Sequence, residues 1–103
     1  MLAVFTAPGR AVRAAQDLAV AAPTIGVQIR AGVHCGEIER RGDDVAGIAV
    51  HLASRVMDRA EPNQVLVSRT ITDLVFGSGL TFHSAGEHEL KGIPATWELY
   101  TPV

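Results

Sequence analysis

The segment from Val45 to Ala60 limits the possible folds more than any other stretch, because its apolar residues recur at helical spacing. One line along this helix is apolar throughout and has three alanines beside it: Ile48, Leu52 and Val56, with Ala49, Ala53 and Ala60. A helix with a single apolar face packs that face into the protein interior. We therefore predict a helix over 45–60 that buries this face and ends before Pro62-Asn63.

The other apolar segments are short and are separated by turn residues, which favours strands and two further helices. Strands are predicted over 1–5, 27–34, 37–41, 64–68, 80–84, 86–90 and 96–101. Helices are predicted from Pro8 to Pro23, with a buried face of Ala11, Ala15, Leu18 and Ala22, and over 70–76. Strands and helices interleaved in this way predict an α+β fold in one domain that spans 1–103.

The composition is that of a packed globular domain. Of the 103 residues, 48% are hydrophobic and 19% are charged, and the formal net charge is −2. The absence of a basic run argues against nucleic acid or an anionic lipid as a partner. No segment reaches the roughly 20 apolar residues that span a bilayer. Cys35 is the single cysteine, which excludes an internal disulfide and is compatible with the expected cytoplasmic location.

A second line on the helix over 45–60 is not apolar. Gly47, His51 and Arg55 repeat at four-residue spacing, roughly 60° around the helix from the apolar line. Such a line presents a polar pair to a cleft, or it is the solvated face of a surface helix. Spacing alone leaves both interpretations open.

Several motifs follow one another along the chain. Residues 32–37 read Gly-Val-His-Cys-Gly-Glu, and residues 42–55 read Gly-Asp-Asp-Val-Ala-Gly-Ile-Ala-Val-His-Leu-Ala-Ser-Arg. The segments 61–68 and 89–93, with Trp97–Tyr100 behind them, complete the series. Together they resemble the C-terminal part of the class III adenylyl and guanylyl cyclase catalytic domain. That family reads Gly-hydrophobic-His-x-Gly-Glu, a charged hairpin, then Asp-x-x-Gly-x-x-Val-Asn-x-Ala-x-Arg.

The resemblance implies a ferredoxin-like α+β fold whose N-terminal strand and helices are missing. It also implies a head-to-tail dimer with a second cyclase protomer, which converts ATP to cyclic AMP and pyrophosphate at a site between the protomers. Mg²⁺ or Mn²⁺ ions assist the reaction in the complete domain. The family's metal-binding aspartates would precede Met1, so this chain is expected to hold no metal ligand and to be inactive alone.

The resemblance also assigns site residues, position by position. Arg55 stands at the transition-state arginine, which contacts phosphate. His51 replaces the Asn that orients the ribose; an imidazole differs from an amide in reach and titrates near neutrality. Asp44 matches the residue that reads the purine, where an acceptor suits the exocyclic amine of adenine. Capping of the helix by Asp43 or Asp44 is the alternative. Gly47 is counted with the substrate-binding residues.

Other polar residues receive no chemical role. Ile93 takes the place of a phosphate-binding lysine found in some members, and that role does not pass to Lys91. Cys35 is expected to be a small packed residue. Three histidines share no metal-ligand spacing and are expected to be structural or surface residues: His34, His83 and His88.

Three functions stay open at this point. The chain is part of an adenylate cyclase, or a non-catalytic cyclase-homology module that regulates or dimerises with a partner, or a sensor domain that binds nucleotide without cyclising it. The DNA upstream of Met1 would separate them, because an intact Phe-x-Asp strand and Gly-Asp-Gly turn favour the enzyme.

Overall fold

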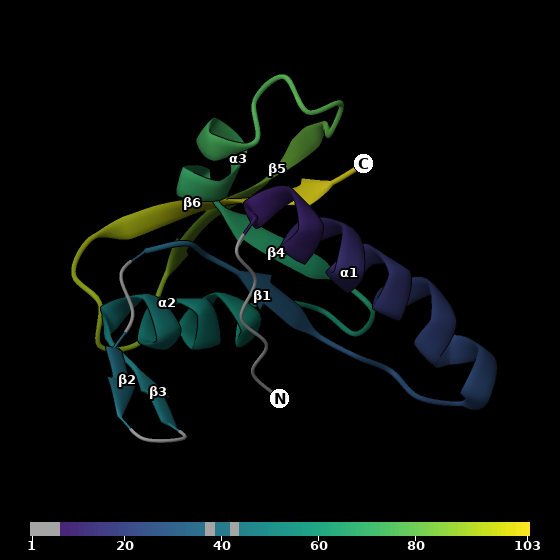
Figure 1. Ribbon diagram of the computed structural model, residues 1–103, viewed down its shortest axis with the longest axis horizontal. Helices are drawn as coiled ribbons and strands as arrows, with labels where there is room; N and C mark the ends of the chain where they lie inside the picture. The colour runs from purple at the N-terminus through teal and green to yellow at the C-terminus, as the bar shows by residue number, and fades with distance from the viewer. Residues whose placement is uncertain (1–6, 37–38, 42–43) are drawn as a thin grey trace.

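The structure is a computed structural model, and it describes residues 7–36, 39–41 and 44–103. The centre of this part is a four-stranded sheet in the order β1-β4-β6-β5 (Figure 1). The strands are β1 Ala31–Val33, β4 Val65–Ser68, β5 Phe82–Glu89 and β6 Thr96–Pro102. β1 and β4 are parallel, whereas β6 runs antiparallel to β4 and β5. A separate hairpin pairs β2, Glu39–Arg41, with β3, Asp44–Ala46.

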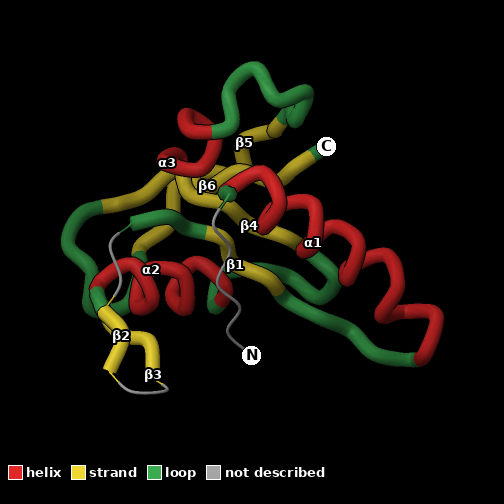
Figure 2. Tube along the Cα trace, viewed as in Figure 1, coloured by secondary structure: helices red, strands yellow, loops and turns green. Residues whose placement is uncertain are grey.

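Helices cover both faces of the sheet (Figure 2). α1, Pro8–Ala21, and α3, Arg69–Leu74, pack over the face to which Val65 and Val67 of β4 point. α2, Ile48–Met57, packs over the opposite face, to which Leu66 points. Because both of its faces are covered, β4 is buried along its whole length. The predicted α+β class is confirmed.

The first helix follows its predicted bounds and buries Ala15 and Ala22 of its predicted face, but not Leu18. It begins at Pro8, and a short 3-10 helix, η1 Ala22–Ile25, follows it. Val12 is fully buried and Leu18 is 47% exposed, so the predicted position of Leu18 in the core is wrong. The C-terminal end of α1 runs past the strands of the sheet (Figure 1), which leaves side chains there little to pack against.

The second helix starts later than predicted, because residues 44–46 belong to β3. The N-cap of α2 is Gly47, at φ 128° and ψ 168°, a backbone conformation that residues other than glycine rarely adopt. Capping by Asp44 is therefore wrong, and Asp43 lies outside the described residues. Ile48 is 64% exposed, which corrects its predicted burial. The observed buried face is Ala49, Leu52, Val56 and Ala60.

The strand predictions are confirmed in place and corrected in length. Of the predicted strand over 27–34, only residues 31–33 form a strand, β1. The two predicted strands over 80–84 and 86–90 form the single strand β5, with a register shift between Ser84 and Glu87. The strands over 64–68 and 96–101 and the helix over 70–76 appear close to their predicted positions. The strand predicted over 1–5 and the turn residues 42–43 lie outside the described residues.

Candidate active site

The chain segment beneath α2 brings the helix backbone very close to the sheet. Side chains alternate in direction along a strand, so Gly32, His34 and Gly36 share one side. A Cβ atom on Gly32 would lie 2.5 Å from the backbone oxygen of Ala53, and one on Gly36 would lie 2.9 Å from the Cβ of Ala49. Real Cβ atoms do not approach other atoms so closely. The two glycines therefore let α2 lie directly on this segment. This close approach explains why glycine stands at both positions of the motif over 32–37.

Between the two glycines, His34 fills the space under the helix. Its Nδ1 lies 2.7 Å from the hydroxyl oxygen of Ser68, a fully buried residue of β4. Its ring meets Trp97 of β6 edge to face, with centroids 6.1 Å apart. Burial lowers the pKa of the His34 imidazole below its usual value of 6.5, which favours the neutral ring. The structural role predicted for His34 is confirmed, and it ties β1 to β4 and β6.

The polar line on α2 places two candidate residues in different surroundings. His51 is exposed, whereas the side chain of Arg55 is 29% exposed. Nη1 of Arg55 donates to Oδ2 of Asp58 at 3.1 Å. Its Nε is buried and has no hydrogen-bond partner among the described residues. A buried donor without a partner costs free energy. Nη2, which forms no hydrogen bond among the described residues and is not buried, is the donor that a ligand or a second chain can reach.

The other two candidate residues lie at the N-terminal end of the same helix. Gly47 is exposed and caps α2, and Asp44 lies on the adjacent strand β3. The structure therefore brings Gly47, His51 and Arg55 onto one line of α2, as the spacing predicted. Asp44 is close to that line in the chain but sits on a different element.

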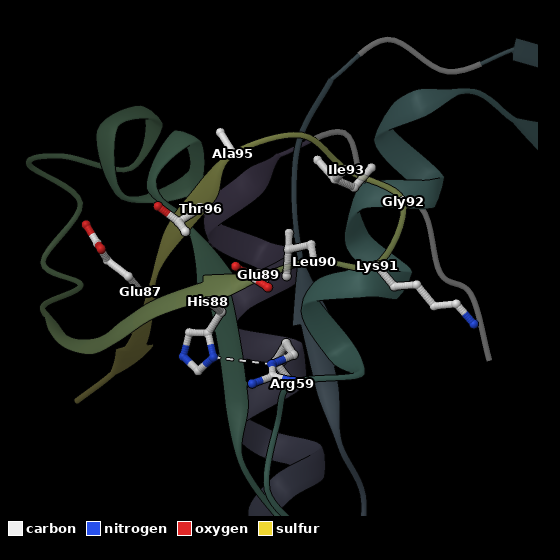
Figure 3. A pocket seen from close by; sticks show the side chains of 10 residues that line it. All are labelled: Arg59, Glu87, His88, Glu89, Leu90, Lys91, Gly92, Ile93, Ala95 and Thr96. Atoms are coloured by element: carbon white, nitrogen blue, oxygen red, sulfur yellow. Dashed lines mark hydrogen bonds between the residues drawn. The ribbon is translucent and has the colours of Figure 1, made fainter.

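A groove is lined by Arg59 and by residues of β5, of β6 and of the connection between them (Figure 3). Its volume is about 710 Å³. Gly92 belongs to its wall, and a Cβ there would lie 3.9 Å from Nε2 of His51, so the connection passes next to the polar line. Lys91 and Ile93 also line the groove.

Arg59, which lies just past the end of α2 and lines the groove, was not among the predicted site residues. Its Nε donates to Nδ1 of His88 at 3.3 Å, drawn as a dashed line in Figure 3. Nε2 of His88 lies 2.9 Å from the carbonyl oxygen of Ala85. These two contacts fit a neutral ring that donates from Nε2 and accepts at Nδ1. His88 is thus a structural residue, as predicted.

A sequence model of the adenylate and guanylate cyclase catalytic domain matches residues 10–101. The chain belongs to this cyclase family. It is 32% identical over 98 residues to an uncharacterised protein of Mycobacterium tuberculosis, and 35% identical over 94 residues to a second one. The matches cover 90% and 89% of the cyclase chain but 33% and 24% of these relatives. The chain therefore spans about a third or less of the length of the curated relatives.

Solved cyclase structures share the fold. An adenylate/guanylate cyclase/hydrolase from Silicibacter pomeroyi superimposes with a TM-score of 0.80 at 23% identity, over 96% of this chain and 64% of that one. An adenylate cyclase from Trypanosoma brucei superimposes with a TM-score of 0.81 at 17% identity, over 93% and 63%. The predicted cyclase fold is confirmed.

The cyclase family implies divalent metal ions, which need a cluster of oxygen ligands. Among the described residues, no group of three or more His, Cys, Asp or Glu side chains could hold a metal ion. The described residues of this chain therefore do not fit a metal site. No helix in the described part of the chain is long and apolar enough to cross a membrane.

Proposed function

We propose that this cyclase chain contributes the arginine-bearing half of an adenylate cyclase active site. In the complete dimer, the ribose 3′-hydroxyl of ATP attacks the α-phosphate, a new oxygen–phosphorus bond closes the ring, and pyrophosphate leaves. The Mg²⁺ or Mn²⁺ ions that the family implies would be bound by the second protomer. The described residues of this chain would bind and orient the nucleotide.

Arg55 carries the proposal. Its side chain is half-buried on the polar line of α2, Nη1 bonds to Asp58, and Nη2 lacks a partner among the described residues. A fixed cation with a free donor stabilises negative charge that develops on a phosphate oxygen, and it does so more strongly where water is excluded. A solvated surface arginine would instead expose its guanidinium. The surroundings of Arg55 thus favour the cleft interpretation over the solvated-face interpretation.

The other candidate residues are proposed to orient the substrate. His51, one turn before Arg55, is exposed and can offer a ring N–H to the ribose. Asp44 would accept a hydrogen bond from the exocyclic amine of adenine, which supports ATP over GTP as the substrate. Gly47, the N-cap of α2, places no side chain at the start of this helix.

The test is complementation of a cyclase protomer that keeps its metal-binding aspartates but has its own arginine replaced by alanine. The chain is mixed with that protomer, and cyclic AMP is measured for the mixture and for each component alone. We expect activity in the mixture only. With Arg55→Ala, kcat should fall by a factor on the order of 10² while Tm stays nearly constant, because a transition-state contact is lost rather than packing.

Arg59→Ala is the matched control, because Arg59 is a neighbouring arginine just past the end of α2 that bonds to His88 rather than to Asp58. Its kcat should stay within about twofold of the unchanged chain. A stable Arg55→Ala variant that keeps full turnover would contradict the proposed role of Arg55.

His51 supports one alternative, a non-catalytic cyclase-homology module that pairs with a partner and regulates it. An imidazole differs from an amide in reach, so it is less suited to orienting the ribose. A chain that binds the aspartate-bearing protomer and changes its activity independently of Arg55 would favour this module.

A further inference from the structure

Asp58 lies where the stability of the helix alone does not favour it. It is the C-cap of α2, and a carboxylate at this end meets the negative pole of the helix dipole. Its side chain is 49% exposed, and ion pairs at such exposed positions contribute little to stability. Neither the dipole nor the ion pair therefore accounts for an acidic residue here.

The contact of Asp58 gives it a different use. Among the described residues, the side-chain hydrogen bonds of Arg55 go to Asp58 alone, through Nη1. The other donor edge of the guanidinium is formed by Nε and Nη2, and neither atom has a hydrogen-bond partner among the described residues. Nε is buried, so Nη2 is the free donor that a phosphate oxygen can reach.

We propose that Asp58 is a positioning residue that holds Arg55 with its free Nη2 donor turned toward the reacting phosphate. The inference rests on the proposed function, because it needs Arg55 to contact the substrate. An arginine on a flexible stem samples many rotamers, and a transition state is stabilised only when the donors are already in place. The carboxylate of Asp58 selects one rotamer before the nucleotide arrives.

The first experiment needs no catalysis. The Nε–H group of Arg55 is followed by NMR in the 103-residue chain, in Asp58→Asn and in Asp58→Glu. The assignment comes from Arg55→Lys, which lacks this group. We expect a dispersed signal with slow hydrogen exchange in the unchanged chain, and a signal at the position of a free arginine in Asp58→Asn. An unchanged Nε–H signal in Asp58→Asn would overturn the proposal.

The second experiment measures the effect on turnover in the complementation mixture described above. Asp58→Asn should lower kcat about tenfold with KM for ATP within about twofold, because the arginine must find its rotamer in each catalytic cycle. Asp58→Glu, which keeps the charge, should recover most of kcat. In an Arg55→Ala background, Asp58→Asn should have no further effect. Asp17→Asn, an exposed acid on α1, is the matched control and should leave kcat unchanged.

The outcomes separate this inference from the proposed function. If the unchanged chain gives no cyclic AMP with a protomer to which it demonstrably binds, the proposed function fails and the positioning role falls with it. If the unchanged chain is active and Asp58→Asn is equally active, only the positioning role fails. A rise in kcat in Asp58→Asn would also overturn it, because Asp58 would then restrain Arg55 rather than orient it.

Discussion

The two long helices attach to opposite faces of the same sheet in different ways. α1 is held by side chains: Val12 and Ala15 meet Val33, Val65 and Val67. α2 is held by side chains from its own buried face, and also by backbone contact over Gly32. The helix that carries the candidate active-site residues is therefore the one whose distance from the sheet is set most tightly.

Under the proposed function, this difference matters for the position of Arg55. A contact made by side chains adjusts when a neighbour is trimmed, whereas a backbone-to-backbone contact has no room for adjustment. A catalytic arginine must stay within a fraction of an ångström of its productive position. Close seating of α2 supplies that rigidity, and α1, which bears no candidate residue, does not need it.

The largest expected effect compares one substitution beneath each helix. Gly32→Ala places a methyl group 2.5 Å from the backbone oxygen of Ala53, so we expect unfolding to become easier by about 3 kcal/mol or more. Gly9→Ala in α1 meets only Val75, at 4.0 Å, and should be neutral or stabilising by up to about 1 kcal/mol. Urea denaturation of both variants measures the two changes. Equal destabilisation would mean that the helices attach alike.

A smaller effect is expected when one leucine in each helix is replaced by alanine. The sequence analysis placed both leucines on a core face. Leu52 of α2 is 8% exposed, so Leu52→Ala should cost about 2–4 kcal/mol of unfolding free energy. Leu18 of α1 is 47% exposed, so Leu18→Ala should cost less than about 1 kcal/mol. Thermal unfolding checks both values. A large cost at Leu18 would show that the end of α1 is packed in solution against something that the described contacts do not include.

The smallest effect concerns pH and the histidine under α2. Burial lowers the pKa of His34, so the unfolded chain binds a proton more readily than the folded one. Stability from this group is complete above its usual value of 6.5 and declines as the pH falls below that value. We expect the fall in Tm from about pH 7 to about pH 5 to be shallower in His34→Gln. His83→Gln, at an exposed position, is the control and should keep the original slope.

Periodicity predicted the candidate line on α2 well and its surroundings poorly. The spacing of Gly47, His51 and Arg55 put them on one side of a helix, and the structure agrees. The same spacing placed Ile48 in the core, although it is 64% exposed. Periodicity gives the angle between residues on a helix but not which turns lie over the sheet. The three-residue spacing of Arg55 and Asp58 permitted their contact, but it did not single out this pair, because acids are common at exposed helix positions.

The amino-acid sequence by itself determined the family, the α+β class, the order of most elements and the residues on the polar line of α2. These follow from motifs and spacings that are local in the chain. Only the tertiary structure decided where α2 begins, how closely it lies over Gly32 and Gly36, and which residues bury His34. It also set Arg55 apart as a half-buried cation whose buried Nε has no partner among the described residues. Those features depend on residues distant in sequence, which meet only when the sheet has formed and both of its faces are covered.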